Sequence, residues 1–245
     1  MVDFIEQLKL YEKGKYLMKK KRKTGSKSVV TRVFKFILKM HLWFWGSIAF
    51  LCVIYQFVNP PITPLMIHRY LFRGYDWHKR YYKPIESIPK RTVRMIMILE
   101  DPNYYKHFGF EWRAVQKAFE KNQRSGRIRF GASTISNQLA RTIFLTTHRN
   151  YFRKYLEIQI TVIMEIIMTK KRMMELYLNY IEWGKGIYGI ETASRHYYGK
   201  GVKALSPDQA MQMVSILTNP IKYSPQTYYN SRSASQRYNM LQRIY

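Results

Sequence analysis

Residues 40–58 form an apolar stretch without a single Lys, Arg, Asp or Glu, and no other feature constrains the chain as strongly. Its nineteen residues would span roughly 28 Å as an α-helix, close to the thickness of the hydrocarbon core of a bilayer. Aromatic side chains gather near both ends, as in interfacial belts, and Asn59-Pro60-Pro61 then stops the helix. The stretch predicts one transmembrane anchor; the alternative is a buried core helix, because four polar or small residues interrupt it.

The preceding 39 residues carry twelve Lys and Arg against three acidic side chains. Such a bias places this side of the anchor in the cytoplasm. A cleaved signal peptide fits poorly, because the basic region is very long and no small-residue cleavage pair follows the apolar run. We therefore expect three parts: a basic cytoplasmic arm at 1–39, a retained transmembrane anchor at 40–58, and one periplasmic or otherwise extracytoplasmic domain at 59–245.

The whole chain of 245 residues has a formal net charge of +27, yet 47% of it is hydrophobic. This apolar content predicts a packed core rather than a disordered chain. The charge indicates an anionic partner, such as nucleic acid, acidic lipid headgroups or a phosphorylated substrate. Cys52 is the only cysteine, which excludes an intramolecular disulfide and a Cys-rich zinc site.

Helical patterns dominate from residue 90 onward. Residues 158–168 are apolar almost all the way round, which is typical of a fully buried helix. Residues 171–180 predict a second helix, and Ser206-Pro207-Asp208 a third, with Ser206 as the N-cap. We expect a mostly α-helical fold with glycines in the connecting loops.

Glu100 is the first candidate for chemistry, since it directly follows the apolar run 95–99. A carboxylate at the edge of a hydrophobic segment is partly desolvated, which makes it a better base toward an alcohol. The alternative is a solvated glutamate at the C-terminal end of a helix. Asp101, Tyr104 and His107 follow it closely.

Two further segments contain polar groups in a suggestive order. Residues 131–141 combine small and hydroxyl side chains, which let backbone approach a ligand, although Ser133 or Thr134 would serve equally as a helix N-cap. A basic cluster then precedes Glu157 and suits a diphosphate, with a solvated basic face as the alternative. Glu157 and Glu165 lie near one face of the buried helix, where a charge needs a partner, so each is either an ion pair or a catalytic group.

In chain order, these segments resemble the motifs of glycosyltransferase family 51, and most closely its monofunctional biosynthetic peptidoglycan transglycosylases. The matching segments are residues 100–109, 131–141, 153–157, 171–179, and 183–184 with 197–200. Departures are mild: Tyr104 stands where the family generally has Phe, Arg141 where Lys is frequent, and Thr142 where Asn is frequent. The resemblance covers roughly residues 60–245, and the arm and single span before them also resemble the family's usual anchor.

The resemblance implies an all-α, lysozyme-like domain with a small membrane-proximal subdomain, anchored in the bacterial inner (cytoplasmic) membrane by a single pass. It also implies polymerisation of lipid II, in which an acceptor 4-hydroxyl attacks C1 of the lipid-linked glycan and expels undecaprenyl diphosphate with inversion. By carry-over, Glu100 is the general base and Glu157 organises the donor diphosphate. The expected neutralising cations are Arg141, Arg149, Arg153 and Lys154. The expected substrate contacts are Asp101, Tyr104, Ser133, Thr134 and Gln138.

No tightly bound cofactor is expected, although a divalent cation (Mg²⁺ or Mn²⁺) at the diphosphate is a further expectation; no dedicated metal motif is visible. The expected partners are lipid II, the growing glycan strand, membrane lipid and other cell-wall synthases, but not nucleic acid. A lysozyme-like enzyme that cleaves glycan and a membrane-tethered basic binding protein remain alternatives. A transpeptidase is not expected, because Ser87-Ile-Pro-Lys90 and Lys23-Thr24-Gly25 match its motifs in reversed order.

Overall fold

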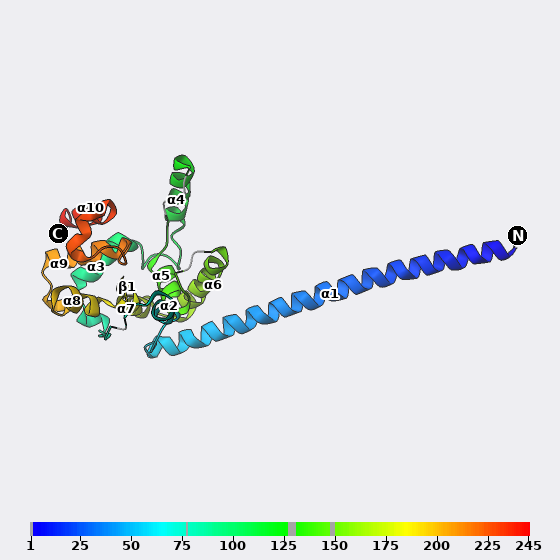
Figure 1. Cartoon of the computed structure of the whole chain (residues 1–245), viewed down its shortest axis with the longest axis horizontal. Helices are drawn as coiled ribbons and strands as arrows, with labels where there is room; N and C mark the ends of the chain where they lie inside the picture. Colours follow the sequence, from blue (N-terminus) through cyan, green and yellow to red (C-terminus); the bar gives the residue numbers. More distant parts are fainter. Residues whose placement is uncertain (1, 77, 127–130, 148–149) are drawn as a thin grey trace. The chain divides into compact units, whose positions relative to one another are not determined.

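The computed structural model describes residues 2–76, 78–126, 131–147 and 150–245 (Figure 1). The chain divides into two compact units, residues 1–48 and residues 49–245.

A single helix, α1 (Val2–Phe57), accounts for the first unit and continues into the second. Its segment Val29–Phe57 is long and apolar enough to cross a membrane, with a mean hydropathy of 1.7. The predicted anchor at 40–58 lies almost wholly within this segment. The candidate span starts earlier because the three basic residues between 29 and 39 are outnumbered by apolar ones, and long basic side chains reach toward headgroups from within a span.

The second unit is almost entirely helical, which confirms the expected all-α class. Its elements are α2 (Pro64–Arg73), η1 (Ile85–Ser87), α3 (Lys90–Glu100), α4 (Trp112–Ser125), α5 (Ile135–Phe144), α6 (Tyr151–Ile167), α7 (Lys170–Tyr180), β1 (Glu182–Gly184), β2 (Ile187–Tyr188), α8 (Ile190–Tyr198), η2 (Val202–Ala204), α9 (Pro207–Ser215), η3 (Ile216–Thr218), η4 (Pro225–Asn230) and α10 (Arg232–Gln242). In the described part of the chain, β1 and β2 form a two-stranded antiparallel sheet.

Short polar side chains start the central helices. Thr134 caps α5, Asn150 caps α6 and Thr169 caps α7, each by accepting a hydrogen bond from the backbone N–H three residues later. Ser206 and Gln209 form a reciprocal capping box at α9, which confirms the predicted start of that helix.

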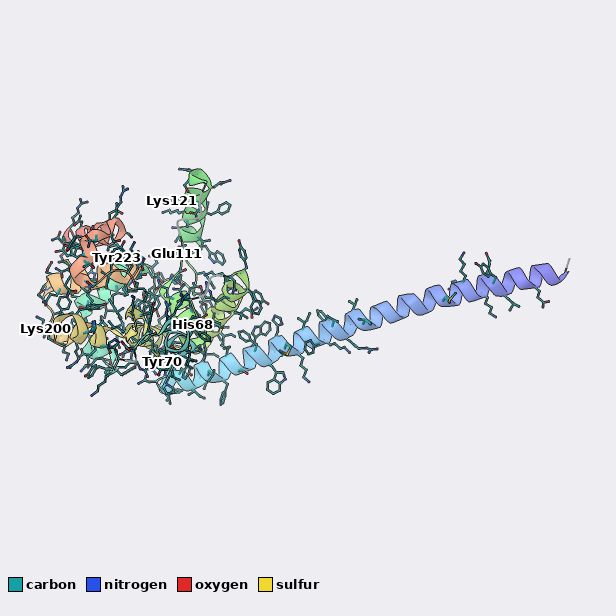
Figure 2. The ribbon with its side chains drawn as sticks, viewed as in Figure 1. His68, Tyr70, Glu111, Lys121, Lys200 and Tyr223 are labelled. Atoms are coloured by element: carbon teal, nitrogen blue, oxygen red, sulfur yellow. The ribbon has the colours of Figure 1, made fainter. Side chains whose placement is uncertain are left out.

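The core lies around α5, which packs against α2, α6 and α7, while α9 packs against α3 and α10. Its largest fully buried side chains include Trp183, Tyr104, Tyr177, Met95 and Ile160. By contrast, α4 has no buried residue and stands away from the other helices of the body; Figure 2 shows Lys121 on it. Packing within this core fixes α3, α5 and α10, the helices that bear on the site.

Candidate active site

Glu100 is the last residue of α3, and its side chain is 11% exposed. The amide Nε2 of Gln138 on α5 donates to its Oε2 at 2.9 Å, and Arg237 on α10 forms an ion pair with its Oε1. The alternative of a freely solvated glutamate therefore does not hold. Three helices meet at this one carboxylate, which is partly shielded from solvent, as a base toward an alcohol requires.

The orientation of Gln138 is fixed from its other side. The hydroxyl of Tyr177 on α7 donates to Oε1 of Gln138 at 3.0 Å, so the NH₂ group must face Glu100. Burial, reinforced by the nearby Glu100 carboxylate, raises the pKa of Tyr177 well above its ordinary value. The phenol thus remains a proton donor, and the chain of bonds runs in one direction, from Tyr177 through Gln138 to Glu100.

Arg237 was not predicted from the sequence. It is 137 residues from Glu100 along the chain and is one of 42 basic residues, so no local pattern distinguishes it. Its helix begins with Ser231 as the N-cap and is tied to α9 by a hydrogen bond from Tyr238 to Asp208. The Nε of Arg237 is buried without a hydrogen-bond partner among the residues that the structure describes.

Asp101 ties the loop after α3 to the start of α5. Its buried carboxylate lies 2.9 and 3.0 Å from Nε2 of His107 and accepts the backbone N–H of Ile135 at 3.0 Å. Both oxygens are thus engaged within the protein. Its contact with substrate stays a prediction.

The loop that follows Asp101 packs against α5 and α6. The Gly109 carbonyl accepts hydrogen bonds from the hydroxyl of Thr134 at 2.7 Å and from the amide of Asn137 at 2.8 Å. Gly109 has φ of +76°, and a Cβ built on it would lie 2.8 Å from Cγ2 of Thr161. Thr134 thus acts as both N-cap and loop anchor, while Ser133 beside it is partly exposed; their substrate contacts stay predictions.

Tyr104 lies in the core. Its ring is fully buried, its hydroxyl donates to the carbonyl of Lys170 at 2.9 Å, and the ammonium of Lys170 lies 4.6 Å from the ring centroid. The ring thus supports the loop from within, and its predicted contact with substrate remains untested.

The second acid, Glu157, is completely buried on α6 and carries two cations of its own helix. Arg153 forms an ion pair with Oε2, and Nζ of Lys154 lies 2.6 Å from Oε1. The requirement that a buried charge be paired is therefore met. The side chain of Lys154 is 45% exposed, so its ammonium can reach a ligand while it neutralises Glu157.

Adjacent residues of α5 contact Glu100 and the helix that carries Glu157. Gln138 donates to Glu100, whereas Oδ1 of Asn137 accepts a 3.4 Å hydrogen bond from Thr161, whose hydroxyl also donates to the Glu157 carbonyl. Helices α3 and α6, which carry the two acids, therefore both contact α5, although the carboxylate of Glu157 itself is bonded within α6. Of the other predicted cations, Arg141 is partly exposed on α5, and Arg149 lies outside the described residues.

Glu165, the other acid of α6, is structural. It accepts hydrogen bonds from Ser136 at 2.6 Å and from Lys170 at 2.7 Å, so it joins α5, α6 and α7. Across the ranges that the structure describes, no group of three or more His, Cys, Asp or Glu side chains is placed to hold a metal ion.

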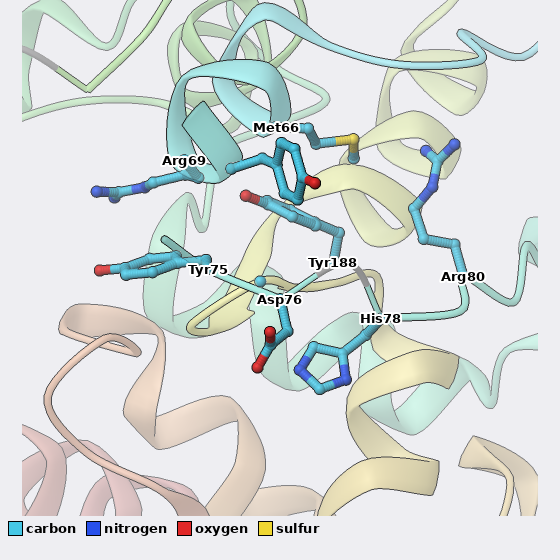
Figure 3. Close-up of a pocket in the computed structure, with 9 residues that line it drawn as sticks. Met66, Arg69, Tyr75, Asp76, His78, Arg80 and Tyr188 are labelled. Carbon is cyan, nitrogen blue, oxygen red and sulfur yellow. The ribbon is translucent and has the colours of Figure 1, made fainter. Parts of the chain in front are cut away.

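A small cavity lies between α2 and the β1–β2 hairpin (Figure 3). Met66, Arg69, Tyr75 and Tyr188 are among its lining residues, and none of the predicted site residues lines it. Next to it, Arg69 pairs with Glu182 at 3.0 Å; burial raises the pKa of Glu182, and the Arg69 guanidinium opposes that rise. This cavity is separate from the two acids.

Comparison with known proteins gives a consistent set of matches. The family model described as transglycosylase matches residues 67–244. A biosynthetic peptidoglycan transglycosylase of Pseudomonas aeruginosa is 35% identical over 223 residues, which cover 88% of this chain and 94% of the relative. One from Caulobacter vibrioides is 41% identical over 172 residues, or 70% and 73% of the two chains. One from Dechloromonas aromatica is 46% identical over 145 residues, or 59% of this chain and 63% of the relative, just under two thirds of its length.

Proposed function

This chain belongs to the transglycosylase family, and from that membership we infer that it is a peptidoglycan glycosyltransferase, an enzyme that polymerises lipid II into glycan strands. The observation that carries the mechanism is the environment of Glu100, a shielded carboxylate fixed by one amide and one guanidinium. Such a group is suited to accept a proton from an alcohol.

In the proposed reaction, the 4-hydroxyl of the acceptor sugar attacks C1 of the lipid-linked donor. The new O–C1 bond forms as the bond from C1 to the diphosphate oxygen breaks, with inversion at C1. Glu100 takes the hydroxyl proton, and undecaprenyl diphosphate leaves with the bond electrons. General base catalysis of this kind contributes about 10²- to 10⁴-fold to a rate.

The basic cluster around Glu157 would stabilise the leaving diphosphate. Arg153 and Lys154 exceed the single charge of Glu157, so the cluster retains a net positive charge toward the diphosphate. Together with Arg141 and Arg149 it would neutralise the negative charge that develops during the reaction. A divalent cation, Mg²⁺ or Mn²⁺, would be bound mainly by the diphosphate oxygens, because both oxygens of Glu157 already have cationic partners.

Localisation forms a second part of the proposal. The basic arm would lie in the cytoplasm, α1 would cross the inner membrane once, and the body would face outward, where a lipid-linked precursor is polymerised. We also propose other cell-wall synthases as partners, because the glycan product must be built into a wall.

Two rival functions predict different outcomes. A glycan-cleaving enzyme needs no cation cluster for a diphosphate, so the pairing of Glu157 with Arg153 and Lys154 favours synthesis. A tethered binding protein would tolerate the loss of Glu100.

The test is to incubate the purified full-length protein in detergent with labelled lipid II and a divalent cation, and to separate the products by size. We expect polymer from the wild type and none from Glu100→Gln, which keeps the shape of the side chain but removes the base. The matched control is Glu86→Gln, because Glu86 is 61% exposed and pairs only at the surface with Lys171. Polymer from Glu100→Gln at the wild-type rate would remove Glu100 as the base, and loss of material from purified sacculi would favour cleavage.

A further inference from the structure

The last turns of α1 are part of the body rather than a loose tether. Residues 49–57 fall in the same compact unit as the rest of the domain. Cys52 is completely buried there, and the ring of Tyr55 packs on that of Phe144 from α5, with centroids 5.9 Å apart. The end of the candidate membrane helix therefore has tertiary contacts of its own.

Arg172, in the first turn of α7, caps this helix end. Its Nε donates to the carbonyl of Tyr55 at 2.8 Å, and its Nη2 donates to the carbonyl of Val58 at 3.0 Å and to Oδ1 of Asn59 at 2.8 Å. The last carbonyls of a helix lack partners within the helix, so a cation beside them is favourable. Since the side chain is only 11% exposed, the guanidinium is largely shielded from competing water.

Other hydrogen bonds join the same two segments. The side chain of Gln56 bonds both the hydroxyl and the backbone N–H of Thr169, at 3.5 and 3.1 Å. At the far end of α7, the hydroxyl of Tyr180 donates to the carbonyl of Pro60 at 2.5 Å. Both ends of α7 are thus fixed to the last turn of α1 and the residues that directly follow it.

The same helix supports the proposed base. Arg172 and Tyr177 are five residues apart, or about 7.5 Å along the helix axis. Tyr177 orients Gln138, and Gln138 donates to Glu100. The end of α1 is therefore connected to the carboxylate through the hydrogen bonds of Arg172, helix α7, and two further hydrogen bonds.

From these contacts we propose that Arg172 is a positioning residue that sets the height of Glu100 above the bilayer. The inference rests on the proposed function, in which substrates anchored by a lipid tail present their reacting atoms at a fixed height. Holding reacting groups in place removes much of the entropic part of a barrier. A loosened junction would let the body tilt and would spread this height over a range, while Gln138 and Arg237 still hold the base.

Two variants separate this role from simple stability. Arg172→Ala removes the whole cap, but it also removes the partner of Glu175 and Tyr82 inside the body. The double variant Gln56→Ala with Asn59→Ala removes hydrogen bonds on the α1 side alone. The control is Lys171→Ala, since Lys171 is the cation next to Arg172 in the chain, is 66% exposed and forms its ion pair with Glu86 at the surface.

The first readout requires no turnover. The full chain carries a spin label at Lys203→Cys, an exposed position, while the one native thiol, Cys52, is buried. In liposomes, the distance from this label to labelled lipid headgroups should be narrowly distributed in the wild type and in Lys171→Ala. It should broaden in both junction variants. An unchanged distribution in the double variant and in a folded Arg172→Ala would overturn the proposal.

The second readout compares two substrates. Polymerisation of lipid II embedded in liposomes should fall about tenfold in the junction variants, whereas turnover of a short-chain, water-soluble analogue should stay near the wild-type rate. Equal losses on both substrates would indicate a structural effect and contradict the positioning role. A wild type inactive on both would contradict the proposed function, and the distance distributions alone would then decide the role of Arg172.

Discussion

At the scale of single residues, two hydrogen-bond donors from distant helices converge on the carboxylate of Glu100. Gln138 is 38 residues away in the chain and Arg237 is 137 residues away. Each donor bonds a different oxygen, so the carboxylate is fixed from two sides. Arg237 also fills the space beside Oε1, so an incoming hydroxyl must share that oxygen with it or displace it.

Arg237→Ala should lower polymerisation strongly, by roughly 10- to 100-fold, because the base loses its charged partner and a buried hydrogen bond to a charged group. The measurement is kcat/KM with lipid II for the wild type and the variant.

Arg237→Lys should keep more activity than Arg237→Ala, because it restores the charge without the fork of donors. Arg243→Ala is the matched control, since Arg243 is exposed at the end of the same helix. If Arg237→Ala kept the same kcat/KM as Arg243→Ala and the wild type, Arg237 would have no influence on the base.

Contacts between residues close in the chain could be predicted from the sequence, whereas contacts between residues far apart in the chain could not. Arg153 and Lys154 precede Glu157 by four and three residues, spacings at which side chains of one helix meet. Arg237 reaches Glu100 only because α9 and α10 fold back onto α3. No periodicity or motif in the chain specifies that return.

At the scale of elements, the predicted helices exist, and their interiors were easier to place than their ends. The helix predicted at 171–180 begins one residue earlier, as α7. The helix predicted at 158–168 begins at Tyr151, because Asn150 supplies a cap upstream of the apolar run. The prediction that 158–168 is fully buried is wrong, because Ile158 is 42% and Ile166 69% exposed, and α6 is buried along one face only. An apolar run therefore indicates a helix without showing which of its residues are buried, and a helix end depends on one side chain and its local hydrogen bond.

The contact between the 101–110 loop and α6 provides a prediction for an element. Gly109→Ala should destabilise the body by about 1–3 kcal/mol, because the new Cβ is strained at φ of +76° and lies 2.8 Å from Thr161. The measurement is denaturant unfolding of the purified protein.

Gly199→Ala is the matched control for that change. Gly199 also has a positive φ, of +68°, but no atom lies within 4 Å of a Cβ built there. Its variant should show only the cost of the backbone conformation. Equal destabilisation by the two variants would mean that the close approach of the loop to α6 contributes nothing.

At the scale of the whole molecule, basic and apolar residues are concentrated in different segments of the chain. The first 39 residues are strongly basic, the span after them is apolar, and the remaining body is also rich in Lys and Arg. A basic body does not prevent export, because long domains cross a membrane largely regardless of charge.

The proposed topology places a reporter fused after Tyr245 outside the cytoplasm and a reporter fused before Val2 inside it. We therefore expect activity after Tyr245 from a reporter that works only outside, and activity before Val2 from one that works only inside. Alkaline phosphatase and a cytoplasmic fluorescent protein would serve as the pair of reporters. Phosphatase activity confined to the N-terminal fusion would mean that the arm faces outward and that the proposed orientation is reversed.

The one-way orientation of Gln138 also bears on inhibitor design. Because Tyr177 occupies the amide oxygen, the amide can offer Glu100 only an N–H, and Arg237 likewise offers only donors. The carboxylate is left with lone pairs and nothing to give. A compound aimed at Glu100 should therefore present a hydroxyl or an ammonium to its carboxylate, because a carbonyl or sulfonyl placed against the same oxygens would meet their lone pairs.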